Sequence, residues 1–304
     1  MPRPRIRSEA KATGALFLLP AASIFAVFVL WPIIQSARYS LFAWDGLGTP
    51  VNFVGFHNYE RMIGDPIFWN ALKNNGVVLL FSLFIQIPLG ISLAILLTGK
   101  MKGLAFFRTI YLSPIVLSGV IVGLLWQWIY NPGFGLANSL LREFGLNGLV
   151  QNWLGDDQRV LLWIIVAGIW RDIGFYIIIF IGSIQAISRE IYEAAEMDGA
   201  TGWQLHRNIT LPLIRPTMLT AATLGIISSF LIFDLIWVMT EGGPYNSSEV
   251  LTTYMFKMAF HLRDWGYSTS LAFTQFFIVA IFTGSVLGII KIRRRSIEGS
   301  TGKV

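Results

Sequence analysis

The chain has 304 residues, of which 54% are hydrophobic and only 13% are charged, and its formal net charge is +6. Soluble domains carry about 25% charged residues, so this composition excludes an ordinary soluble protein and indicates an integral membrane protein. There are no cysteines, which excludes disulfides and thiol chemistry.

Six apolar stretches are long enough to cross a bilayer. Four contain no charged residue, and each exceeds the roughly 20 residues that a membrane-spanning helix needs. Two more carry isolated charges, Arg171 and Asp172 in one and Asp234 in the other. The first stretch is too long for the core of a signal peptide and is expected to be a retained helix. The sequence therefore predicts six spans, at approximately 14–35, 74–98, 108–130, 160–183, 217–239 and 269–290.

Basic residues are unevenly distributed between the two sides of the membrane. With six spans both termini share a side, which carries fifteen Lys and Arg residues against seven on the other side. An excess of basic residues marks the cytoplasmic side and also accounts for the positive net charge without a nucleic-acid partner. We therefore expect one transmembrane domain, 1–304, with both termini and the loops 99–108 and 184–216 in the cytoplasm.

The 184–216 loop contains the longest polar stretch on the predicted cytoplasmic side. Ser188 is placed to cap a helix, and Gly199 is placed to end it. The stretch Thr201–Gln204 has the spacing of a capping box, so a second short helix is expected there, with Leu211-Pro212 as its stop. Such a pair of helices either docks on a soluble partner or is an amphipathic elbow that only links two spans.

The same loop resembles the EAA loop of permease subunits in bacterial binding-protein-dependent ABC importers. The matching positions are Glu193, Ala194, Ala195, Asp198, Gly199, Ala200, Ile209, Leu211, Pro212 and Pro216. Three further stretches are similar to the carbohydrate-uptake branch, which includes the maltose and glycerol-3-phosphate permeases. They are 53–59 (FVGFHNY), 65–74 (DPIFWNALKN) and 240–260, which opens with TEGGP. The resemblance covers nearly the whole chain.

The resemblance implies a type I importer permease fold in the bacterial cytoplasmic membrane. It also implies four kinds of partner: a second homologous permease subunit, two cytoplasmic ATPase subunits that receive the EAA loop, an extracytoplasmic solute-binding protein and a sugar substrate. No G-x-x-x-x-G-K-[ST] motif occurs, so ATP and Mg are expected on the partner ATPase. No catalytic or metal-ligating residue is assigned. Glycerol-3-phosphate, or another polyol or phosphodiester, is the alternative cargo.

Ionisable residues inside spans are costly, and they are therefore functional candidates. Arg171 and Asp172 are adjacent, point about 100° apart on a helix and are expected not to share a face. In the fifth span, four residues recur at three- and four-residue intervals and are expected to share one helical face. They are Phe230, Phe233, Asp234 and Trp237. The candidate sugar path comprises Arg171, Asp172, Ser229, Phe230, Phe233, Asp234 and Trp237. The alternative is that these residues form structural pairs or pack in the core.

Other classes of function fit the sequence less well. An intramembrane enzyme would need clustered polar groups, whereas His57, His206 and His261 lie in separate predicted loops and no HExxH or GxSxG motif occurs. A channel or scaffold would not need a coupling loop. Two G-x-x-x-G stretches, 119–123 and 284–288, would allow close helix approach within the chain or at a seam between subunits.

Overall fold

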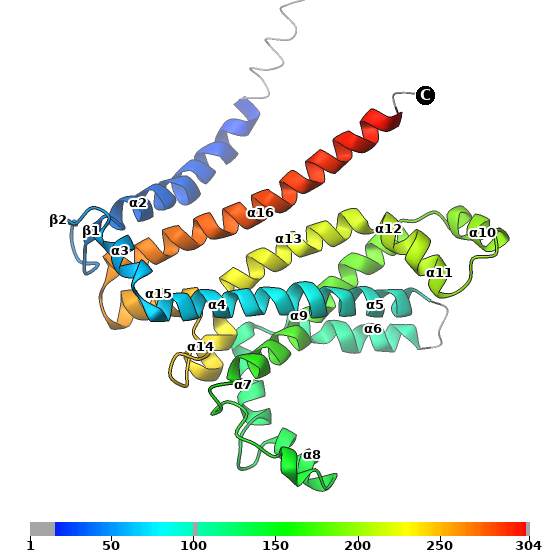
Figure 1. Ribbon diagram of the computed structural model, residues 1–304, viewed down its shortest axis with the longest axis horizontal. Helices are drawn as coiled ribbons and strands as arrows, with labels where there is room; N and C mark the ends of the chain where they lie inside the picture. Colours follow the sequence, from blue (N-terminus) through cyan, green and yellow to red (C-terminus); the bar gives the residue numbers. More distant parts are fainter. Residues whose placement is uncertain (1–15, 100–102, 302–304) are drawn as a thin grey trace, which may run out of the picture. The chain divides into compact units, whose positions relative to one another are not determined.

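The computed structural model describes residues 16–99 and 103–301. The basic residues at positions 3, 5, 7, 11, 100, 102 and 303, which contribute to the predicted charge asymmetry, lie outside that part. Five of the described helices are long and apolar enough to cross a membrane, and a bent pair of helices brings the number to six if the pair is counted as one span. The expectation of an all-α membrane protein is confirmed (Figure 1). The chain divides into two compact units, Met1–Gly64 with Met255–Thr274 and Asp65–Tyr254 with Gln275–Val304.

The first unit contains the span Leu16–Tyr39 and the connection that follows it. Its elements after residue 25 are η1 (Ala26–Leu30), α2 (Trp31–Tyr39), the strands β1 (Phe42–Ala43) and β2 (Asn52–Phe53), α3 (His57–Ile63) and η6 (Lys257–His261). The two strands pair antiparallel, with Phe42 opposite Phe53. The hairpin places α3 next to the end of α2.

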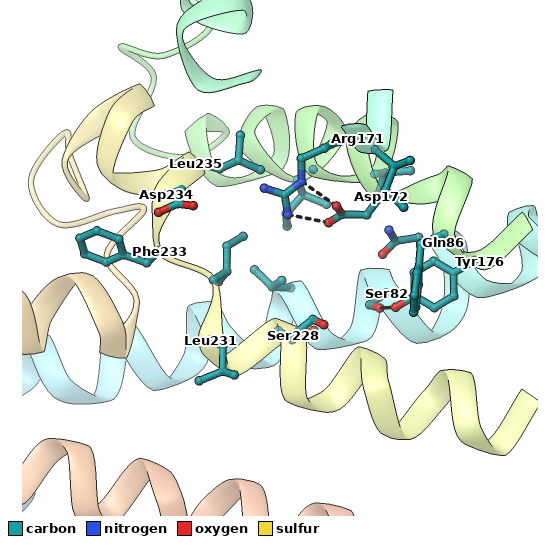
Figure 2. A pocket seen from close by; sticks show the side chains of 18 residues that line it. Ser82, Gln86, Arg171, Asp172, Tyr176, Ser228, Leu231, Phe233, Asp234 and Leu235 are labelled. Atoms are coloured by element: carbon teal, nitrogen blue, oxygen red, sulfur yellow. Dashed lines mark hydrogen bonds and ion pairs between the residues drawn. The ribbon is translucent and has the colours of Figure 1, made fainter. Parts of the chain in front are cut away.

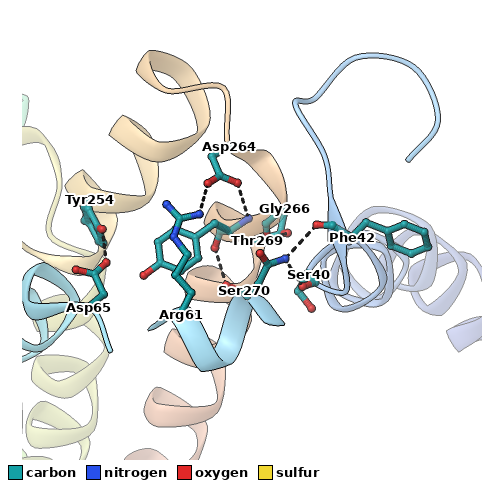
Figure 3. Close-up of polar contacts among 11 residues, drawn as sticks. Ser40, Phe42, Arg61, Asp65, Tyr254, Asp264, Gly266, Thr269 and Ser270 are labelled. Atoms are coloured by element: carbon teal, nitrogen blue, oxygen red, sulfur yellow. Dashed lines mark hydrogen bonds and ion pairs between the residues drawn. The ribbon is translucent and has the colours of Figure 1, made fainter. Parts of the chain in front are cut away.

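Side chains of the 53–59 stretch fix this connection. The amide Nδ2 of Asn58 donates to the carbonyl oxygens of Ser40 and Phe42 over 2.8 and 3.0 Å. Figure 3 shows the neighbouring ion pair, in which Arg61 lies 2.5 Å from an Asp264 carboxylate oxygen. The Arg61 guanidinium also lies 4.1 Å from the centre of the Tyr267 ring. The connection therefore has its own ordered packing.

The second unit contains most of the remaining helices. They are α4 (Pro66–Phe81), η2 (Ser82–Gln86), α5 (Ile87–Thr98), α6 (Leu104–Leu112), η3 (Ser113–Val116), α7 (Gly119–Ile129), α8 (Leu136–Glu143), η4 (Asn147–Leu149), α9 (Val160–Gln185), α13 (Arg215–Leu231) and α14 (Asp234–Thr240). The last two elements, α15 (Leu251–Phe256) and α16 (Trp265–Thr301), cross the boundary between the units. Figure 1 shows α4, η2 and α5 as one continuous helical run.

The second span begins earlier than predicted. Asp65 caps α4 by accepting a hydrogen bond from the Ile67 amide over 2.8 Å, and Pro66 occupies the first helical turn, where its missing N–H costs nothing. Within the run, residues Ser82–Gln86 form a π-helical turn. Such turns shift the side chains that follow to a different face, and they occur frequently at functional sites.

The third span is not one straight helix, and the prediction of a continuous 108–130 helix is wrong. The segments Phe106–Val116 and Gly119–Ile129 meet at an angle of 105°. The bend follows the 3₁₀ turn that contains Pro114, whose backbone nitrogen carries no hydrogen and so cannot donate a hydrogen bond. Ser118 then caps α7 by accepting from the Ile121 amide over 3.3 Å.

The fifth span is also interrupted. Its residues 232 and 233 leave the helical region, with φ/ψ of −61°/123° at Ile232 and −135°/−61° at Phe233. The expectation that Phe230, Phe233, Asp234 and Trp237 share one helical face is therefore wrong. The Ile232 carbonyl oxygen, which has left the helix ladder, accepts a hydrogen bond from the Thr252 hydroxyl.

Two carboxamides from other helices bind the end of α13. Asn75 Nδ2 in α4 donates to the Ser229 carbonyl oxygen over 2.8 Å. Gln275 Nε2 in α16 donates to the Phe230 carbonyl oxygen over 2.8 Å. Backbone carbonyls away from water need a partner, and these side chains replace the helix bonds that the interruption removes.

Two apolar clusters lie at opposite ends of α9. One contains Ile164 and Ala167 of α9 together with Leu235 of α14. The other contains Phe180 of α9 with Ile91 of α5. The middle of α9, between these clusters, carries the ionisable residues Arg171 and Asp172, and this is where the packing opens into a cavity.

The polar 184–216 loop folds as two helical segments, as predicted. They are α10 (Arg189–Met197) and a run of α11 (Trp203–Leu205), η5 (His206–Thr210) and α12 (Leu211–Leu213). Ser188 caps α10, and Gly199 follows it with a φ of +83°. The Gln204 side chain accepts from the Thr201 amide over 3.3 Å. Pro212 does not stop the second segment, because it lies in the first turn of α12, where proline is tolerated.

Candidate functional site

A cavity of about 490 Å³ lies within the second unit. Its walls come from the α4–η2 run, η3, α9 and the interrupted α13–α14 span. The lining residues are Val78, Ser82, Gln86, Ile115, Ile165, Gly168, Ile169, Arg171, Asp172, Phe175, Tyr176, Ser228, Ser229, Leu231, Ile232, Phe233, Asp234 and Leu235. Both interruptions described above border the cavity, through Ile115 in η3 and through Ile232 and Phe233.

Arg171 and Asp172 form a two-point ion pair at the cavity wall. Arg171 Nε donates to Asp172 Oδ1 over 2.6 Å and Nη2 donates to Oδ2 over 2.9 Å, as Figure 2 shows. The expectation that these adjacent residues do not share a face is wrong. The long arginine side chain closes the angular separation, and both residues line the cavity.

Asp234 of α14 lies near the same arginine, on the side away from Asp172, as Figure 2 shows. A Cβ placed on Gly119 would lie 2.8 Å from Arg171 Nη1 and 2.9 Å from Asp234 Oδ2, so both groups rest against this glycine. A Cβ on Gly123 would lie 2.9 Å from Val238 of α14. The 119–123 motif therefore serves close packing within this chain, between α7 and α14.

The remaining predicted path residues separate into three groups. Phe233 lines the cavity, and Trp237 stacks on it with ring centres 5.6 Å apart. Ser229 also lines the cavity, but its hydroxyl donates back to the Gly225 carbonyl oxygen over 2.7 Å. Phe230 is buried away from the cavity, with its ring 6.2 Å from that of Phe282.

Sequence reasoning missed a polar wall beside Asp172 of the ion pair. Ser82 and Gln86 of η2 and Tyr176 of α9 line the cavity, and Figure 2 shows them grouped together. The Ser82 and Tyr176 hydroxyl oxygens are 3.5 Å apart. The signal available in the sequence was the pair of polar residues four positions apart inside an uncharged apolar run.

Comparison with known proteins identifies the fold and the family of the chain. Residues 67–294 match the family described as "Binding-protein-dependent transport system inner membrane component". The chain belongs to this family. It is a multi-pass membrane protein, and the predicted resemblance to importer permeases is confirmed.

Two relatives and one solved structure resemble this chain over most of their length. The probable ABC transporter permease protein YurN of Bacillus subtilis is 38% identical over 87% of this chain and 91% of its own. The trehalose/maltose transport system permease protein MalF of Thermococcus litoralis is 30% identical over 94% of this chain and 96% of its own. A chain of a bacterial ABC transporter involved in alginate import has a TM-score of 0.82, with 24% identity, and the match covers 94% and 98% of the two chains. This last likeness confirms the permease fold.

Proposed function

We propose that the protein is the permease subunit of an ATP-driven importer of neutral carbohydrates and that its substrate path runs through the cavity. The observation that carries the proposal is a cavity with hydroxyl, carboxamide, carboxylate and aromatic groups in the middle of the spans of a member of this family. Sugars are recognised by such groups, which hydrogen-bond the hydroxyls and stack on the ring face.

The charges at the cavity favour a neutral cargo over glycerol-3-phosphate or another anion. The lining residues with side chains that are normally charged are one arginine and two aspartates, and the arginine is already held by Asp172. A phosphate would need an available cation, because burying an unpaired anion beside carboxylates is costly. A sugar hydroxyl needs no counter-charge and can donate to a carboxylate.

The 184–216 loop is the proposed contact with a separate ATPase. Three properties support this role: the EAA sequence, the turn at Gly199 and the exposure of the α10 face that carries Met197, whose side chain is 88% exposed. ATP binding by the partner would move the loop as a rigid body and switch the cavity between inward and outward access. The further partners of the proposed complex are a second permease subunit and an external solute-binding protein.

The test combines purification with uptake. A tagged chain, isolated from the membranes of its source organism, is expected to bring down an ATPase and a second permease. Cells that lack the chain are expected to lose uptake of one or more labelled sugars from a panel of trehalose, maltose, lactose and diacetylchitobiose, while glycerol-3-phosphate uptake is unchanged. A purified complex without an ATPase, or loss of glycerol-3-phosphate uptake alone, would contradict the proposal.

A further inference from the structure

The Gln86 side chain differs from the other buried carboxamides of the chain. Its exposed fraction is 7%, and it lines the cavity. Asn58, Asn74, Asn75, Asn138 and Gln275 are equally buried, and each donates at least one hydrogen bond to a backbone carbonyl. Gln86 makes no side-chain hydrogen bond within residues 16–99 and 103–301.

The polar side-chain atoms of Gln86 are not among the enclosed, unpartnered atoms of the described chain, so they are accessible from the cavity that the residue lines. Figure 2 shows the amide end of Gln86 pointing into the cavity, on the side of Asp172 and Ser82. The carboxamide is therefore available to a molecule in the cavity. It offers two N–H donors and one carbonyl acceptor, which suits a hydroxyl that donates and accepts.

The surroundings of Gln86 are held in place by close helix packing. Ser82 and Gln86 lie four residues apart in the π-helical turn, and Asp172 and Tyr176 lie four residues apart in α9. A Cβ on Gly90 would lie 2.8 Å from the Tyr176 Cβ. This contact brings α5 onto α9 and leaves no room for a larger side chain.

A second glycine fixes the hydroxyl pair beside Gln86. A Cβ on Gly225 of α13 would lie 2.9 Å from the Ser82 hydroxyl oxygen and 3.3 Å from the Tyr176 hydroxyl oxygen. Three helical runs therefore meet where these hydroxyls approach each other. The result is a preorganised polar wall made of one carboxamide and two hydroxyls.

We propose that Gln86 is a specificity-determining residue that hydrogen-bonds a hydroxyl of a neutral sugar in the cavity, with Ser82 and Tyr176 as its neighbours. The inference rests on the proposed function, and it names a wall that the path residues predicted from the sequence do not include. It assigns the π-helical turn a role, which is to direct Ser82 and Gln86 toward the substrate.

The test is a comparison between side-chain removal and hydroxyl removal. The uptake of each monodeoxy derivative of the transported sugar is measured relative to the parent sugar, in wild type and in Gln86→Leu. Any preference of an external binding protein for one sugar over another cancels, because the same binding protein serves wild type and Gln86→Leu. For one derivative, the ratio of its uptake to that of the parent sugar is expected to be about fivefold higher in Gln86→Leu than in wild type. That derivative lacks the hydroxyl that binds Gln86, so loss of the Gln86 side chain removes a hydrogen bond from the parent sugar and none from the derivative.

Two variants serve as controls. Gln86→Glu keeps the size and the acceptor oxygens but loses the amide donors, and its ratio is expected to lie between those of wild type and Gln86→Leu. Ser92→Ala lies on the same helical run, is exposed and does not line the cavity, and it is expected to leave every ratio unchanged.

Three outcomes would overturn the inference. Ratios that are the same in wild type and in Gln86→Leu for every derivative would show that Gln86 touches no hydroxyl. Loss of the assembled complex in both Gln86 variants would show that the residue is structural. Absence of uptake of every sugar in the panel by wild type would overturn the sugar assignment first, and with it this inference.

Discussion

Asn75 Nδ2 donates to the Ser229 carbonyl oxygen over 2.8 Å, across 154 positions of the chain. The same carboxamide accepts from the Leu251 amide over 3.0 Å. One fully buried side chain therefore joins α4 both to the end of α13 and to the start of α15.

Replacement of this carboxamide is expected to destabilise the protein. Asn75→Leu leaves a buried carbonyl and a buried amide without a partner, which costs about 1–3 kcal/mol for each group. The measurement is the thermal unfolding of the purified complex in detergent. Asn147→Ala changes an exposed asparagine that makes no side-chain hydrogen bond within the described part of the chain, and it is the matched control. Equal melting temperatures for the two variants would contradict the prediction.

A methyl group at position 119 is expected to disturb the cavity. Gly119→Ala would place its Cβ 2.8 Å from Arg171 Nη1 and 2.9 Å from Asp234 Oδ2. Overpacking of this kind costs about 1–3 kcal/mol and would also lower transport by displacing both charged groups. Gly284→Ala is the control, since a Cβ there meets no atom within 4 Å in the described chain. Uptake and melting temperature are measured for both, and a Gly119→Ala variant that matches Gly284→Ala would refute this account.

The substitution Asp234→Asn tests whether this carboxylate acts in transport or only supports the structure. If its carboxylate contacts the sugar, Asp234→Asn is expected to change uptake kinetics and to leave the amount of assembled complex unchanged. If it only balances the charge of Arg171, the same change is expected to reduce assembly or thermal stability. Uptake rate and complex yield, measured on the same membranes, separate the two results.

The turn at Gly199 is expected to be required for coupling. Its φ of +83° lies in the left-handed region, which costs a residue with a Cβ about 1–2 kcal/mol. Gly199→Val and Glu193→Lys are expected to abolish uptake and to release the ATPase during purification. Gly182→Val, in the helical region of α9 with no atom within 4 Å of its Cβ in the described chain, is the control. Normal uptake in both loop variants would mean that the loop only links two spans.

The predicted orientation can be tested at two exposed positions. Tyr245 is 93% exposed and Met197 is 88% exposed, on opposite predicted sides of the membrane. A cysteine at position 245 is expected to react with an impermeant reagent in right-side-out vesicles, and one at position 197 only in inside-out vesicles. The chain has no native cysteine to give a background signal. The reverse labelling pattern would invert the topology.

The sequence by itself determined the membrane class, the apolar runs that form the candidate spans and the polar loop with its glycine turn. A spanning helix satisfies its own backbone in lipid, so a long apolar run is sufficient to identify one. The caps at Ser188 and the turn at Gly199 are equally local, because the hydrogen bonds and the backbone angle involve residues close together in the chain. These features need no knowledge of distant contacts.

Only the tertiary structure decided where the spans break and which side chains line the cavity. The interruption at Ile232 and Phe233 depends on donors in other helices, and Gln275 is one of them. The apolar sequence around the break contains no local pattern that predicts it, because the hydrogen bonds that replace the lost helix bonds come from carboxamides distant in the sequence. Because the helix is interrupted between them, Phe230 is buried in the core while Asp234 lines the cavity, although the sequence spacing predicted one shared face. Gln86 acquires its position only when α9 and α13 pack beside its π-helical turn.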